Sequence, residues 1–246
     1  MRGLAFLFLL IIFSGNAFAQ PGNALSIDLA AKSIDISTGF NGAELLVYGT
    51  KTQPGDMAIT VRGPTETMMV RRKEQIIGIW MNRKSLRFEE VPSYYDLALS
   101  GKESDIAPSD ILLRYDIGLD ALQFETRENV DTAVVDTFRE ALIRNKQGQG
   151  LFPLEPKPIK FINNDFFRAS FYLPANVPTG LYRVKAYLFR DGQVVDTQER
   201  EIKVAQTGFS AEIFLFSRTQ SLAYGLIAVL MALFFGWGAY VVLRRE

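Results

Sequence analysis

The 246-residue sequence contains neither cysteine nor histidine. Without cysteine there are no thiol nucleophiles and no disulfides. Without histidine there is neither an imidazole base nor a common ligand of zinc, copper and haem iron. A folded domain of this chain must therefore be stabilised by burial alone, which requires a substantial hydrophobic core. Because two of the side chains that hydrolases and metalloenzymes use most often are missing, we expect a protein that is not an enzyme and that holds no cofactor or metal.

An excess of charge is also missing, because Lys plus Arg and Asp plus Glu both number 27. A surface without a basic excess does not attract the phosphates of DNA or RNA, so we expect no nucleic-acid partner. Hydrophobic residues make up 48% of the chain, but part of them lie in two apolar blocks at its ends. The segment between these blocks has the composition of an ordinary soluble domain.

Catalytic and nucleotide-binding motifs are absent, including Gly-x-Ser-x-Gly, Ser-x-x-Lys and the phosphate-binding loop. The charged clusters have ordinary structural explanations. Glu89 and Glu90 are neighbours at the end of a predicted strand and point to opposite faces. Arg71-Arg72-Lys73 follows a predicted strand, and we interpret it as a charged turn; the alternative is a site for an anion or lipid headgroups.

Aromatic side chains offer a second kind of candidate. Trp80, Tyr94 and Tyr95 could line a binding surface, since aromatic residues contribute much of the energy at protein interfaces. Core packing explains them equally well, and it also explains Met68 and Met69. The carboxylates do not form an Asp-x-Asp-x-Asp loop with its glycine, so we predict no calcium site.

Residues 1–19 have the pattern of a cleaved signal peptide. Arg2 precedes an apolar run from Leu4 to Phe13, and the small residues Ala17 and Ala19 flank Phe18 before the cleavage point. The alternative is an uncleaved N-terminal anchor, but the apolar run is short for a membrane span. The pattern predicts export across the inner membrane.

Residues 221–243 contain no charged side chain and would rise about 35 Å as a helix, enough to cross the hydrocarbon core of a bilayer. The alternative is a buried core helix, but this segment has no polar face to meet water. Arg244 and Arg245 follow directly, and basic residues beside a span prefer the cytoplasm. We therefore predict a transmembrane helix at 221–243, a cytoplasmic tail at 244–246 and a juxtamembrane helix at 209–220.

Small residues recur at spacings of three and four along this span and would form one stripe on a helix. They are Ser221, Gly225, Ala228, Ala232, Gly236 and Ala239. Small residues let two helix backbones approach closely in lipid, so the stripe is a candidate packing face for a membrane protein or for a second copy of the chain. The alternative is that Gly and Ala are simply common in membrane spans.

Between the apolar ends the sequence predicts a mainly β protein with a helical insertion. Alternating apolar and polar residues separated by turn residues predict an N-terminal β region at 20–105, with strands at 25–29, 33–37, 45–48, 57–62, 67–71, 76–80 and 86–89. Helical spacing of apolar residues predicts an insertion at 106–150. A linker at 153–158 begins the second β region, 151–208.

The second β region carries the signature of an immunoglobulin-like sandwich. Apolar and polar residues alternate at 167–173 and at 182–188, which predicts a strand at each. Gly180 and Tyr182 lie at the start of the second strand, and a tyrosine at this place in such folds can brace a corner. Asp191-Gly192 predicts a hairpin turn, followed by strands at 194–197 and 201–204. Whether the two β regions form one domain or two is left open by these patterns.

Several segments resemble a family of alphaproteobacterial transmembrane proteins whose function is uncharacterised. They are the strand and turn Ile34-Asp35-Ile36-Ser37-Thr38-Gly39-Phe40-Asn41-Gly42-Ala43-Glu44, the step Gly63-Pro64, Pro178-Thr179-Gly180-Leu181-Tyr182 and the final span with Arg244-Arg245. The resemblance implies a topology, and it implies a sulfite-exporter-like permease as a partner.

We therefore expect a membrane-anchored periplasmic accessory or interaction protein, single-pass in the bacterial inner membrane, with its C-terminus in the cytoplasm. Its expected partners are the inner membrane and either a multi-span permease or a second copy of the chain, contacted through the transmembrane helix. The alternative is a tethered periplasmic binding module for a small ligand or a cell-wall polymer, in which aromatic residues and Arg71-Arg72-Lys73 would make the contacts.

Overall fold

The computed structural model describes residues 23–37, 39–76, 78–207, 213 and 216–243. Over these residues the chain is mainly β, with helices inserted between strands and one long apolar helix at the C-terminal end, as the sequence predicts. The predicted signal peptide, 1–19, and the predicted cytoplasmic tail, 244–246, lie outside the described residues.

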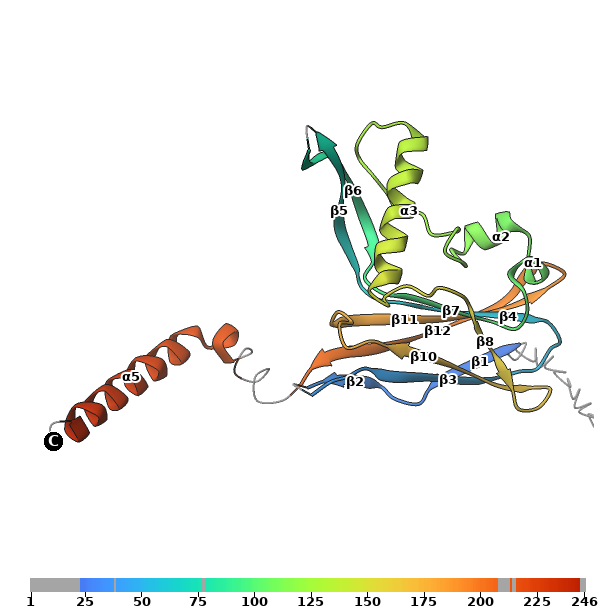
Figure 1. Ribbon diagram of the computed structural model, residues 1–246. Helices are drawn as coiled ribbons and strands as arrows, with labels where there is room; N and C mark the ends of the chain where they lie inside the picture. The colour runs from blue at the N-terminus through green and yellow to red at the C-terminus, as the bar shows by residue number, and fades with distance from the viewer. Residues whose placement is uncertain (1–22, 38, 77, 208–212, 214–215, 244–246) are drawn as a thin grey trace, which may run out of the picture.

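Two sheets stack to form a sandwich (Figure 1). The first sheet is antiparallel and has the order β1 (Leu25–Leu29), β3 (Ala43–Lys51), β10 (Phe166–Leu173) and β9 (Lys160–Phe161). The second has the order β2 (Ser33–Ile36), β12 (Gln193–Gln206), β11 (Gly180–Arg190), β4 (Asp56–Arg62), β7 (Tyr95–Leu99) and β8 (Lys157–Pro158). The segment 153–158, predicted as a linker, therefore includes a short strand, because β8 adds in parallel to the edge of β7.

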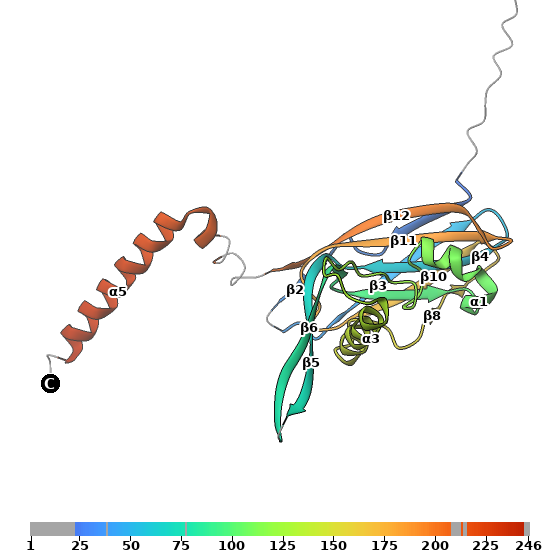
Figure 2. The ribbon, with the colours of Figure 1, turned by 90° about the horizontal axis from the view of Figure 1, so that it is seen from above.

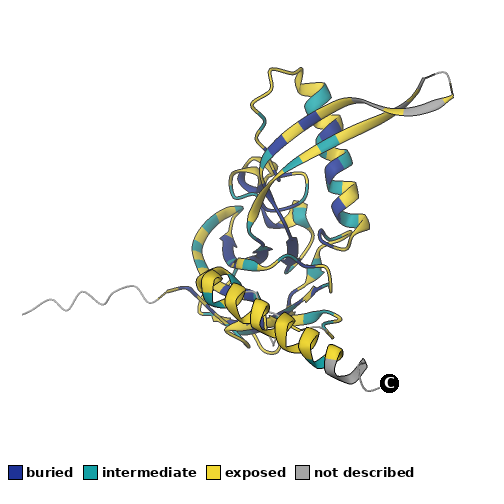
Figure 3. Cartoon of the chain, turned by 90° about the vertical axis from the view of Figure 1, so that its left-hand side faces the viewer, coloured by how far each residue is buried: buried dark blue, intermediate teal, exposed yellow. Residues whose placement is uncertain are grey.

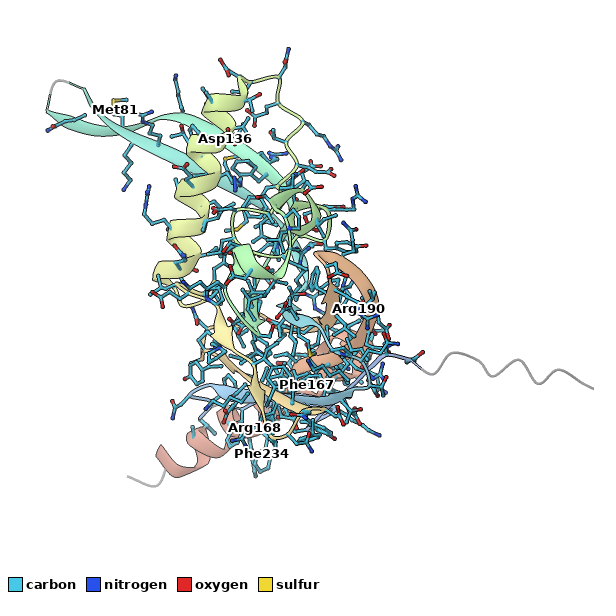
Figure 4. All side chains as sticks on the ribbon, turned by 90° about the vertical axis from the view of Figure 1, so that its right-hand side faces the viewer. Met81, Asp136, Phe167, Arg168, Arg190 and Phe234 are labelled. Carbon is cyan, nitrogen blue, oxygen red and sulfur yellow. The ribbon has the colours of Figure 1, made fainter. Side chains whose placement is uncertain are left out.

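The core lies between the two sheets and follows the strand period. In β10, Phe167 and Phe171 are completely buried and alternate with polar or half-buried neighbours. Phe167 lies within the sandwich, and Arg168 lies at its outer surface (Figure 4). Each large apolar side chain that is fully buried stabilises the fold by about 1.5–3 kcal/mol relative to exposure. A core of such side chains can stabilise the fold of a chain that has no disulfides.

Both sheets draw strands from both predicted β regions. β3, from the first region, pairs with β10 of the second, and β4 pairs with β11. Buried side chains from all four strands belong to one hydrophobic cluster. The regions 20–105 and 151–208 therefore share a single core.

A tyrosine braces the start of β11, as the sequence predicts. The hydroxyl of Tyr182 donates to the carbonyl oxygen of Pro178 at 2.5 Å, and its ring is fully buried. Gly180 just before it has φ +149°, and a Cβ there would lie 2.7 Å from Pro64 Cγ. The predicted turn at Asp191-Gly192 is also present, with φ of 50° and 73°. After this turn β12 runs unbroken, so the two short strands predicted there are one long strand.

A hairpin and a helix project together from the sandwich, as Figures 1 and 2 show. The hairpin consists of β5 (Thr65–Ile76) and β6 (Ile79–Pro92), and the helix is α3 (Thr132–Gly148). We call these three elements the arm. Two short helices, α1 (Glu103–Ile106) and α2 (Ser109–Arg114), precede α3 in the chain.

The arm corrects two sequence predictions. The segment 76–80 is not one strand, because β5 ends at Ile76, Gly78 turns the chain with φ +81° and β6 begins at Ile79. Arg71-Arg72-Lys73 is not a turn but continues β5, where it pairs with residues 82–85 of β6. Charged residues are tolerated here because a two-stranded ribbon exposes one face to water. Met81 lies toward the far end of this ribbon, and 52% of it is exposed (Figure 4).

Part of the arm is buried, as the burial colours in Figure 3 show, and most of its buried side chains are apolar. Phe138 and Leu142 of α3 are buried in the same cluster as Leu86 and Phe88 of β6. The side chain of Asp131 caps α3 by accepting from the backbone N–H of Ala133 at 3.0 Å. Such a cap contributes about 1 kcal/mol to helix stability.

The last element is α5, which spans Ser221–Leu243. Figure 3 shows it exposed along the part whose burial is described. Of the predicted juxtamembrane helix, Ile213 and residues 216–219 are helical, and the other residues before Gln220 lie outside the described part. The ring of Phe216 contacts the ring of Tyr224 with centroids 6.2 Å apart.

Candidate functional site

α5 has the geometry of a membrane span. Its 23 residues are an unbroken helix, and its apolar side chains are exposed, with Leu230 at 56% and Phe234 at 67%. Among the described residues it is the one helix long and apolar enough to cross a membrane. A helix whose apolar surface is uncovered on every side needs lipid or other helices around it.

The predicted packing face remains continuous on this helix. At about 100° per residue, its six members, which run from Ser221 to Ala239, fall within an arc of about 80°. Leu226, Leu230 and Leu233 fall on the opposite side. A Cβ built at Gly225 or Gly236 meets no heavy atom within 4 Å, so nothing described in the chain itself covers the stripe.

The arm carries the second candidate site, a basic groove between β5 and α3. The groove has a volume of about 270 Å³. Its lining residues are Val70, Arg71, Arg72, Thr137, Phe138, Ala141 and Arg144. Three of the seven are arginines and none is acidic, so the groove is suited to a negatively charged ligand. Residues 71–73 were predicted to be a charged turn. In the structure two of them, Arg71 and Arg72, line this groove.

Two buried charged residues, Lys146 of α3 and Asp96 of β7, are engaged in structural contacts. The ammonium of Lys146, whose side chain is 3% exposed, lies 2.8 Å from Glu66 Oε1 and donates to the carbonyl oxygen of Ser93 at 3.2 Å. Asp96, with a side chain 5% exposed, forms an ion pair with Lys157 and accepts from the backbone N–H of Leu97. Sequence reasoning missed both pairs, since their partners lie far apart in the chain.

Two of the three aromatic residues proposed for a binding surface, Tyr94 and Tyr95, are core residues, and the side chain of Trp80 lies outside the described part of the structure. Tyr94 is 1% exposed, and its hydroxyl lies 3.0 Å from both the Asp96 carboxylate and the carbonyl oxygen of Tyr172. Tyr95 is fully buried and accepts the N–H of Gly118 at 2.9 Å. Their rings therefore offer no exposed face to a ligand.

The remaining candidates lie apart from one another. Glu89 pairs with Arg127 at 2.8 Å, whereas Glu90 is an exposed residue with φ 55°. Met68 packs against the core, but Met69 of β5 is 46% exposed. Over the described part of the chain, no cluster of three or more acidic residues is placed to hold a metal ion.

A family model described as "Putative transmembrane protein (Alph_Pro_TM)" matches residues 24–245. The chain belongs to this family. The match includes the whole sandwich, the arm and α5, so it extends over both the β part and the apolar helix. No curated protein matches the chain.

This transmembrane family member should lose stability at alkaline pH. Burial raises the pKa of Tyr94, Tyr95 and Tyr182 well above the usual value near 10, and the nearby Asp96 carboxylate raises that of Tyr94 further. The unfolded chain releases these protons near pH 10 while the folded chain retains them. Their contribution to stability is therefore complete below about pH 10 and falls as the pH rises beyond it.

We expect ultraviolet absorbance to show at least these three of the nine tyrosines ionising only together with loss of circular dichroism. Titration of all nine near pH 10 with the fold intact would contradict this burial.

Proposed function

We propose that this protein is a membrane-anchored interaction protein of the bacterial inner membrane that acts by binding rather than by catalysis. α5 crosses the membrane once, the sandwich and the arm lie in the periplasm, and the C-terminal residues lie in the cytoplasm. The observation that carries the proposal is the exposure of α5 on every side, which only lipid or another membrane helix can cover.

The basic tail supports the orientation. Arg244 and Arg245 follow the span directly, and such residues favour the cytoplasmic side. An N-terminal export signal at 1–19 would place the β part on the opposite side of the membrane.

We also infer that the sandwich is of immunoglobulin type. The sheet order β1-β3-β10-β9 corresponds to strands A-B-E-D of such domains, and β12-β11-β4 corresponds to G-F-C. The contact of Tyr182 with Pro178 is the corner contact found at the start of strand F. The arm then interrupts the fold after strand C, where an insertion leaves both sheets intact.

The partner we propose for α5 is a multi-span membrane protein, a permease of the sulfite-exporter type, which packs against the stripe of small residues. A second copy of α5 is the other occupant of the same face. Close helix contact in lipid depends on small residues, so a leucine in the stripe should keep the helices apart.

Gly236 and Gly238 provide a matched pair for testing this contact. They lie about 200° apart on the helix, and a Cβ at either one meets nothing within 4 Å. Purification of the tagged full chain in mild detergent should recover a multi-span membrane protein. Gly236→Leu should remove at least nine tenths of it, a loss of about 1.4 kcal/mol or more, whereas Gly238→Leu should remove little. Equal recovery with both variants, or a wild-type protein that is monomeric and without a partner, would reject the proposal.

A further inference from the structure

The two outer edges of the β5–β6 ribbon differ. The edge of β6 is covered, because Glu89 donates its backbone N–H to the carbonyl oxygen of Glu125 at 2.8 Å and Arg87 donates its own to Glu128 Oε1 at 3.1 Å. The edge of β5 has no such cover, since no hydrogen bond joins the backbone of residues 67–71 to any described residue outside β6. In an antiparallel pair every second residue directs its N–H and C=O away from the partner strand, so β5 presents an open ladder.

The basic groove follows this open edge. Val70 and Phe138 supply an apolar floor, and Thr137, Ala141 and Arg144 form the wall on α3, spaced by four and three residues on one side of the helix. A strand edge beside a helix is the arrangement in which several domains bind an extended peptide as an added strand. The edge supplies backbone hydrogen bonds, and the floor receives alternate side chains of the peptide.

The positive charges that line the groove favour a negatively charged ligand. Arg144 is exposed and forms no ion pair with any described side chain, and Glu140, one turn earlier, does not line the groove. Arg71 is exposed, and its only described side-chain contact is with Met69 Sδ at 3.7 Å. Lys73 continues the basic run along β5. A carboxylate placed between Arg71 and Arg144 would meet positive charge from both the strand and the helix.

We propose that the β5 edge and α3 bind an extended acidic segment of a partner protein, which adds to the ribbon as a third strand. Its carboxylates meet Arg71 and Arg144, and an apolar side chain between them packs on Val70 and Phe138. A second copy of β5 would bring the same basic run opposite itself, and like charges on adjacent strands are unfavourable. A lipid headgroup matches the charge but has no backbone to pair with the open edge.

This docking site is separate from α5 and does not depend on the packing of the membrane helix. The probes are synthetic eight-residue peptides in which Glu alternates with one apolar residue, Val, Leu or Tyr in turn. Fluorescence anisotropy with the detergent-solubilised full chain should show at least one of them binding about tenfold or more tightly than its counterpart with Lys in place of Glu. N-methylation of alternate backbone nitrogens should abolish binding, because strand pairing requires the N–H groups.

Charge reversal distinguishes the groove from general attraction. Arg71→Glu with Arg144→Glu should weaken the acidic peptide about tenfold or more and should favour the Lys peptide instead, since each exposed ion pair contributes a few-fold. Arg200→Glu, an equal change per residue at an exposed site on β12, should leave binding unchanged. Circular dichroism of each variant checks the fold, and Ala141→Trp, which fills the groove without changing charge, should block binding independently.

Three results would overturn the proposal. One is that none of the acidic peptides binds, and another is that N-methylated peptides bind as well as unmodified ones, which indicates charge alone. The third is that phosphatidylglycerol vesicles bind through Arg71 and Arg144 and displace the peptides, which would make the arm a headgroup-binding surface. Gly236→Leu changes α5 alone, so its effect on copurification tests the packing of the membrane helix and not the binding of the peptide.

Discussion

Arginine placed at both Leu230 and Phe234 is expected to move the protein from the membrane fraction to the soluble fraction. These residues lie near the middle of α5, where an arginine opposes insertion by about 3 kcal/mol, so two should oppose it by about 6 kcal/mol. Both side chains are exposed, so the substitutions remove no contact within the folded part of the chain. Alkaline extraction of membranes followed by immunoblotting measures the distribution.

Leu222→Arg is the matched control. Leu222 is the second residue of α5 and is 91% exposed, and an arginine at a helix end can extend to the membrane interface at little cost. This variant should stay in the membrane. If the variant with arginine at both Leu230 and Phe234 also stays in the membrane fraction after alkaline extraction, insertion of α5 is not what anchors the protein in the membrane.

Lys157→Met is expected to destabilise the sandwich by about 2–3 kcal/mol. The Asp96 carboxylate is buried, with a side chain 5% exposed, and Lys157 is its counter-ion. Removal of one member of a buried ion pair leaves an uncompensated charge and costs about 3–5 kcal/mol. The expected loss lies below this range because the Lys157 side chain is 34% exposed and water can partly replace it. Chemical denaturation of the detergent-solubilised chain measures the change.

The double variant Asp96→Asn with Lys157→Met separates the effect of the buried charge from the effect of packing. Asp96→Asn removes the buried charge. Its amide oxygen can still accept from the backbone N–H of Leu97, and its NH2 group can donate to the Tyr94 hydroxyl, which then donates to the carbonyl oxygen of Tyr172. Combined with Lys157→Met, Asp96→Asn should recover at least half of the lost stability, because no unpaired charge remains. Additive losses in the double variant would show that Asp96 and Lys157 contribute independently.

The alternation of apolar and polar residues predicted much of the sandwich. In residues 167–173, buried side chains alternate with exposed or half-buried ones, so this strand has one face on the core. In residues 182–188 the same alternation holds from Tyr182 to Ala186, and Tyr187 and Leu188 are then both buried. Tyr182 and the turn at Asp191-Gly192 were predicted because their conformations depend on local chemistry. These features need only a few neighbouring residues to specify them.

The arm was predicted poorly because its strands depend on distant partners. Arg71-Arg72-Lys73 has no apolar period, yet it stays extended because residues 82–85 pair with it. One local signal was available, because Gly78 lies between residues 71–73 and residues 82–85 and suits a left-handed turn. With the turn placed there, the basic run falls on the strand that precedes it.

The same contrast between local and distant contacts separates the two candidate sites. The stripe on α5 could be predicted because helical spacing alone determines which residues share a side. The groove could not, because Arg71 and Arg144 are 73 positions apart in the printed sequence and meet only when α3 packs on the hairpin. The pairing of Asp96 with Lys157, 61 positions apart, escaped prediction for the same reason.

The absence of cysteine allows the topology to be measured with single introduced thiols and no background labelling. Lys203 is exposed on β12, and Glu246 follows the span. A membrane-impermeant maleimide added to spheroplasts should label Lys203→Cys fully and Glu246→Cys only after the membrane is permeabilised. Labelling of Glu246→Cys in intact spheroplasts, or protection of Lys203→Cys, would contradict a single crossing by α5 with the sandwich in the periplasm.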